Sequence, residues 1–169
     1  MFSELQQPAY LHVLINHLPI IGTAIGALAL LIAIVLRQRV ALIPTLIIIL
    51  VAGASAWPVY ETGSAAYPSI RKISDDAGSD ELDQHLDRAE RTVWTFYAMA
   101  GLAAIALIVP MRWPRTSLPL AIATVLAAIA CTAVGGYIAQ SGGRIRHTEF
   151  RLPLNQASST PTTESEPRH

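Results

Sequence analysis

The sequence predicts an all-α protein, an integral membrane bundle of four helices that run alternately up and down. Of its 169 residues, 52% are hydrophobic and only 14% are charged, a composition too apolar for an ordinary soluble domain. The apolar residues gather in four runs long enough to cross the ~30 Å hydrocarbon core of a bilayer. Two of the three connections between these runs are short, and short connections join antiparallel neighbours.

The spans are expected at about 12–36, 40–57, 93–110 and 118–140, within one transmembrane domain of residues 1–152. No charge occurs from Leu18 to Leu36. Pro19 removes a backbone donor and predicts a kink that frees a carbonyl near Ile15. The N-terminus lacks the basic start and cleavage site of a secretory signal, so we expect the first span to remain in the mature protein.

An outer loop is expected over 58–92, irregular over 59–78 and helical from about residue 79. Ser79 has the side chain of an N-cap, and acidic residues follow it in the first turn, where the helix dipole favours them. Leu82, Leu86 and Ala89 define an apolar face, and His85 lies within that face. A histidine therefore points inward where a leucine would fit.

The fourth span is expected to end at Gly142-Gly143, because glycine commonly adopts the left-handed conformation that stops a helix. Residues 153–169 are rich in Ser, Thr, Pro and Glu and predict a disordered polar tail.

Arginines predict the orientation of the bundle. The two short connections carry Arg37, Arg39, Arg112 and Arg115 with no acid between them, which by the positive-inside rule belong to the cytoplasm. The N-terminus, the 58–92 region and the C-terminal tail are then expected outside, in the periplasm if the protein lies in a bacterial inner membrane.

Several function classes are excluded by what the sequence lacks. A formal net charge of zero and the absence of a basic run argue against nucleic acid. The single cysteine, Cys131, permits no disulfide within the chain, and no C-x-x-C-H attaches haem covalently. There is no G-x-S-x-G, Walker or Rossmann motif. Glu61 beside Tyr60 is the one candidate proton acceptor for a quinol site, and solvation is its commoner role.

Four histidines fall on the same predicted side of the membrane: His12, His17, His85 and His147. Taken singly, each would be an ordinary interfacial cap, but together they favour a shared site for noncovalent b-type haem, whose iron takes imidazole ligands. His17 and His85 are the first candidate pair, and His12 with His147 a second. His12 and His17 lie about 140° apart around a helix and cannot clamp one iron from one face. One or two haems are therefore expected.

Arginines are candidates for haem propionates. Arg144 and Arg146 follow the fourth span, and Arg91 precedes the third, each placed to pair with a carboxylate at the surface. For any one of them, anchoring to lipid headgroups is the commoner role.

Two alternatives stay open. The histidines, completed by Glu61 or Glu149, are also suited to zinc or copper, although their spacing matches no compact motif. The small residues of 52–56 allow a helix or a flat cofactor to approach closely, and helix packing is the commoner explanation, as in a structural or assembly subunit of a membrane complex.

At H-x-x-x-N-H-x-P-I-x-G, which begins with His12, the chain resembles a bacterial family of small four-helix predicted membrane proteins of unknown function. The resemblance covers about residues 10–150 and includes His17-Leu18-Pro19, His85, and Gly142-Gly143 through His147. It implies a haem-binding membrane subunit that accompanies electron-transfer proteins. We therefore expect a non-catalytic subunit that passes electrons between a membrane donor such as quinol and an external redox partner.

Overall fold

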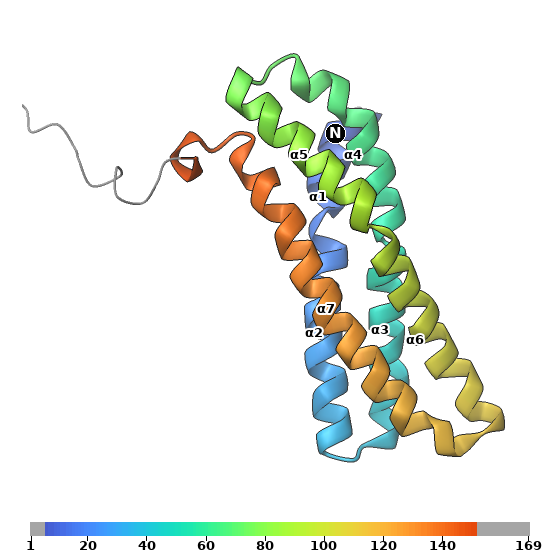
Figure 1. Ribbon diagram of the computed structural model, residues 1–169. Helices are drawn as coiled ribbons and strands as arrows, with labels where there is room; N and C mark the ends of the chain where they lie inside the picture. Colours follow the sequence, from blue (N-terminus) through green and yellow to red (C-terminus); the bar gives the residue numbers. More distant parts are fainter. Residues whose placement is uncertain (1–5, 152–169) are drawn as a thin grey trace, which may run out of the picture.

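Four long helical stretches pack side by side, in a computed structural model that describes residues 6–151. They cover Pro8–Val35, Arg39–Arg71, Asp76–Arg112 and Pro114–Arg144, and each contains a window apolar enough to cross a membrane. Neighbours in the chain run in opposite directions, with tight turns at one end of the bundle (Figure 1). The predicted all-α bundle of four long apolar helices is confirmed, and each helix is a candidate membrane span.

Three of the four stretches are interrupted once. The first divides at Asn16 into α1 (Pro8–Ile15) and α2 (His17–Val35), and the second at Ser55 into α3 (Arg39–Ala54) and α4 (Ala56–Arg71). Pro19 and Pro58 follow these breaks by three residues and remove the donors that Ile15 and Ala54 would have used. The interruption predicted from Pro19 is therefore observed.

The third stretch divides at Val93 into α5 (Asp76–Thr92) and α6 (Trp94–Arg112), without a proline. Here the Phe96 amide donates to the Val93 carbonyl at 3.0 Å, a three-residue step, and the hydroxyls of Thr92 and Thr95 donate to carbonyls of the preceding turn. Only the fourth helix, α7 (Ser117–Arg144), which follows a short 3₁₀ turn η2 (Pro114–Thr116), continues without interruption among the described residues.

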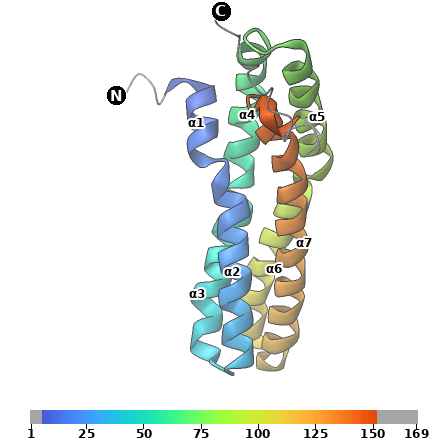
Figure 2. The ribbon, with the colours of Figure 1, turned by 90° about the vertical axis from the view of Figure 1, so that its left-hand side faces the viewer.

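The interruptions divide the bundle into two parts. Helices α2, α3 and α6 contain 19, 16 and 19 residues, a rise of about 24–28 Å that matches the hydrocarbon thickness. Exposed Trp57 and Trp94 lie beside two of the breaks, as is typical of a membrane interface. We call the part beyond the breaks, made of α1, α4, α5 and residues 135–144 of α7, the cap (Figure 2).

The membrane part has an apolar core and an apolar outside. Leu30, Ile49, Met99 and Ala103 are buried between the helices, whereas large aliphatic side chains of every spanning helix face outward. Helices α2 and α3 approach closely at Gly26, where a β-carbon would come 2.6 Å from Cγ1 of Ile49. This close approach places backbone against side chain, the usual way in which membrane helices gain contact.

The structure of the cap differs from the predicted outer loop. Most of residues 59–78 is helical, because α4 continues to Arg71 and packs against α1 and α5. Helix α5 begins at Asp76 rather than near residue 79, and its N-cap is Asp75, whose Oδ1 accepts from the Gly78 amide at 2.9 Å. Tertiary contacts outweighed the Gly and Pro signals that had predicted a loop.

The predicted end of the fourth span is also corrected. Gly142 and Gly143 lie inside α7, which continues to Arg144, and no glycine of the described part has a positive φ. A 3₁₀ turn, η3 (Thr148–Phe150), follows. The predicted polar tail, 153–169, lies outside the described residues.

Candidate functional site

Two of the predicted histidines meet inside the cap. His12 of α1 and His85 of α5 face each other with ring centres 6.4 Å apart and ring planes at 81°. They come from the two halves of the chain, so only the folded bundle brings them together. Both side chains are shielded but not sealed from solvent.

Backbone carbonyls fix which ring nitrogen carries the proton. Nδ1 of His12 lies 2.9 Å from the carbonyl oxygen of Val59 on α4, and Nδ1 of His85 lies 2.9 Å from that of Ile138 on α7. A carbonyl oxygen only accepts, so Nδ1 is the donor in both cases. Each neutral ring therefore keeps a lone pair on Nε2, the arrangement that metal-binding histidines use.

Glycines make room for both rings. A β-carbon on Gly63 of α4 would lie 2.8 Å from Cε1 of His12, and one on Gly142 of α7 would lie 3.0 Å from Cε1 of His85. Gly63 follows Val59 by four residues, and Gly142 follows Ile138 by four. Each half of the chain thus contributes a histidine on its first helix and a matching carbonyl and glycine on its second. The sequence alone gave no signal for this role, because glycine in an apolar helix also serves plain helix packing.

The other two predicted histidines lie elsewhere. His17 begins α2 and is exposed. It follows His12 by five residues, so it faces outward where His12 faces inward. His147 lies beyond α7, also exposed, with Nδ1 2.8 Å from Oε1 of Glu149. The structure therefore pairs His85 with His12, and neither His17 with His85 nor His147 with His12.

Of the three arginines predicted to bind haem propionates, two lie beside carboxylates of the protein and the third is exposed. Arg91 donates from Nε to Asp87 at 2.8 Å, and Arg144 lies 3.7 Å from Oε1 of Glu81. Arg146 is exposed.

An arginine that the sequence analysis missed, Arg88, lies one turn after His85 on α5. Its Nη1 donates to the Tyr137 carbonyl at 2.7 Å, and its guanidinium lies 4.2 Å from the centre of the Tyr137 ring. These contacts fix α5 against α7 beside the histidine pair.

Three buried oxygen atoms near the pair have no partner among the described residues. They are Oδ1 of Asn16, Oγ of Ser64 and Oε2 of Glu81. Asn16 lies four residues after His12, Ser64 directly follows Gly63, and Glu81 lies four residues before His85. An unpaired buried polar group costs about 1–3 kcal/mol, so contact with a polar group of a ligand would be favourable for each of these atoms.

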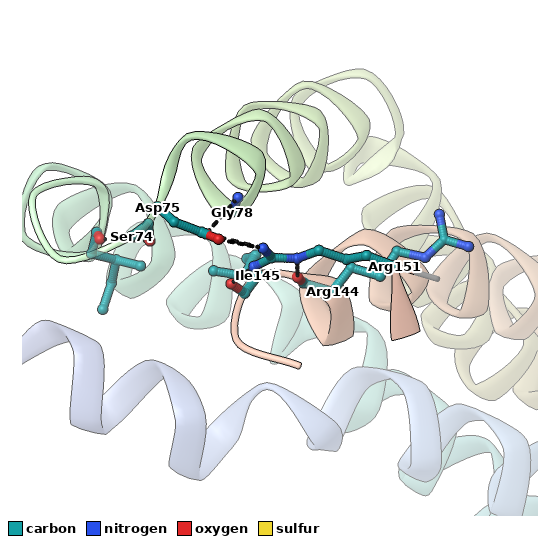
Figure 3. A network of polar contacts seen from close by, with 7 residues as sticks. Ser74, Asp75, Gly78, Arg144, Ile145 and Arg151 are labelled. Carbon is teal, nitrogen blue, oxygen red and sulfur yellow. Dashed lines mark hydrogen bonds and ion pairs between the residues drawn. The ribbon is translucent and has the colours of Figure 1, made fainter. Parts of the chain in front are cut away.

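An ion-pair network closes the cap at its outer end (Figure 3). Arg151 donates to Oδ2 of Asp75 at 2.7 Å, and its guanidinium also donates to the carbonyls of Arg144 and Ile145. The start of α5 is thereby joined to the end of α7. The hydrogen bond from Arg151, with that from the Gly78 amide, holds the pKa of Asp75 below its ordinary value of 3.8.

The site offers two metal ligands rather than three. Within residues 6–151, no group of three or more His, Cys, Asp or Glu side chains is placed to hold a metal ion. Structural zinc is held by four protein ligands and catalytic zinc by three. A haem iron takes only its axial ligands from the protein, since the porphyrin supplies the rest.

Comparisons with protein-family models, with curated proteins and with solved structures return no match. The chain is therefore described by its own architecture. It is a small four-helix membrane protein with two facing imidazoles in its cap.

Proposed function

We propose that the protein binds one b-type haem between His12 and His85 and passes electrons between a membrane donor, such as quinol, and an external redox partner, as a subunit of a larger complex. The haem would supply the reversible one-electron chemistry. The protein's own part is to present two neutral imidazoles from different helices and to exclude competing ligands. One observation carries the proposal: both rings have Nδ1 bound to a carbonyl and Nε2 without a hydrogen bond to residues 6–151, with ring centres 6.4 Å apart.

The separation of the rings supports this assignment. A metal–imidazole bond is about 2 Å long and the ring centre lies about 1 Å behind the bound nitrogen, so two rings on opposite sides of one ion have centres about 6 Å apart. The observed separation of 6.4 Å is close to that value. The unpartnered oxygens of Asn16 and Ser64 further support a ligand with polar groups in the cap.

The orientation is part of the proposal. Arg37 and Arg39 lie where α2 is followed by α3, and Arg112 and Arg115 lie where α6 is followed by α7. Their charge favours the cytoplasmic side, which would place the cap, both termini and the haem on the outer side of a bacterial inner membrane.

Histidine substitutions test the proposal with controls from the same chain. His12→Ala and His85→Ala should each abolish the b-type signal in reduced-minus-oxidised and pyridine haemochrome spectra of protein prepared with haem. His17→Ala and His147→Ala, at exposed positions, should keep the signal. Both variants should bind one haem per chain. Absence of the b-type signal from the wild-type protein would contradict the proposed function. Loss of the signal on substitution of His17, instead of His12 or His85, would contradict the assignment of the ligands.

A further inference from the structure

Helix α1 differs from α4 and α5 in what it presents to the outside of the cap. The outward face of α1 consists of Tyr10, Val13 and Leu14, which are 46%, 65% and 58% exposed. Helix α5 exposes Asp80, Gln84 and Asp87 instead, and α4 beyond Trp57 exposes no large hydrophobic side chain. The cap is therefore apolar on its α1 side and polar on its α4 and α5 sides.

The apolar face of α1 continues directly into the outer face of α2. Exposed side chains recur every three or four residues along both helices, across the break at Asn16, at Tyr10, Leu14, Leu18, Ile21, Ile25, Leu28 and Ile32. No Asp, Glu, Lys or Arg occurs in the stretch Pro8–Val35, and beside the break the polar side chain of His17 is exposed. The 28 residues of this stretch rise about 42 Å, longer than the hydrocarbon core and equal to the bilayer with its interfacial layers.

We infer that the outer face of α1 lies in the interfacial layer of the bilayer, in contact with lipid, while α4 and α5 are in water. The face belongs to lipid because it continues the surface that α2 presents to the membrane, and because Tyr10 ends it as aromatic side chains commonly end membrane surfaces. His12 then approaches the site from the lipid side and His85 from the aqueous side. This inference does not depend on a bound haem.

Accessibility of a spin label tests it in the full-length protein. A single cysteine is placed at Leu14, Leu28 or Gln84 in a Cys131→Ser background. The buried thiol of Cys131 donates a weak bond to the Thr95 carbonyl, which the hydroxyl of serine can also make. Each variant is labelled with a nitroxide and reconstituted in phosphatidylcholine–phosphatidylglycerol vesicles. Collision rates are measured with oxygen, which concentrates in lipid, and with a water-soluble nickel chelate.

The ratio of oxygen to nickel collisions at Leu14→Cys should exceed that at Gln84→Cys several-fold and lie below that at Leu28→Cys, which is deeper in the hydrocarbon core. A ratio at position 14 equal to that at position 84 would place α1 in water and overturn the inference. Exclusion of both reagents at position 14 would assign the face to another protein or a second copy and would overturn it equally. Haem spectra of the same samples report separately on the proposed function.

Discussion

The imidazole of His85 lies directly against the backbone of Gly142, where a β-carbon would come within 3.0 Å of both Cε1 and Nδ1. The ring keeps its hydrogen bond to the Ile138 carbonyl only because that space is empty. His12 stands in the same relation to Gly63.

Alanine at either glycine should therefore damage the site. Gly63→Ala or Gly142→Ala should displace the adjacent ring, lower the stability of the protein by about 1–3 kcal/mol through overpacking, and weaken haem binding. Gly136→Ala, on the same helix as Gly142 with nothing within 4 Å of the added carbon, should be neutral or more stable by up to about 1 kcal/mol. Thermal unfolding in detergent and haem titration measure both effects, and equal behaviour of the two α7 variants would contradict the role of Gly142.

Ser64→Ala should have opposite effects on the empty and the loaded protein. The Oγ of Ser64 is buried without a partner in the described part of the chain, so its removal should stabilise the haem-free protein by about 1 kcal/mol. If the hydroxyl contacts the ligand, the same change should weaken haem binding. Ser69→Ala, which removes a hydroxyl bonded to the Ala66 carbonyl at 2.7 Å, is the control and should stabilise neither state. Unfolding of protein prepared with and without haem gives the comparison.

Gly26→Ala should separate α2 from α3. Its added carbon would lie 2.6 Å from Cγ1 of Ile49, a buried side chain, and relief requires a shift of a helix or of a packed rotamer, at about 1–3 kcal/mol. Gly101→Ala on α6, where the new carbon meets nothing within 4 Å, is the matched control. Unfolding in a denaturing detergent should reveal a loss for the first variant alone.

Acid should loosen the outer end of the cap. The pKa of Asp75 is lowered in the folded protein by Arg151 and the Gly78 amide, so this contact stabilises the cap above the ordinary pKa of 3.8 and is lost as pH falls through the lowered value. At neutral pH, Asp75→Asn and Arg151→Gln should mimic that loss. Hydrogen exchange over the first turn of α5 should rise in both variants, and Glu90→Gln at the far end of α5 should leave it unchanged.

The spans could be predicted because hydrophobicity is a local property of the sequence. The position of the four histidines at one end of the bundle could be predicted because the chain reverses its direction after each span. The helical α4 could not, since Gly63 and Pro68 favour a loop and only packing against α1 and α5 makes the helix stable. The choice of His12 over His17 as the partner of His85 depends on how α1 is rotated about its axis. The sequence showed that the two rings face different ways but not which one faces inward.

The repeated arrangement of histidine, carbonyl and glycine makes the orientation of one ring independent of the other. Each hairpin supplies its own half, from His12 to Gly63 and from His85 to Gly142. Damage to one half therefore leaves the carbonyl and the glycine of the other half in place.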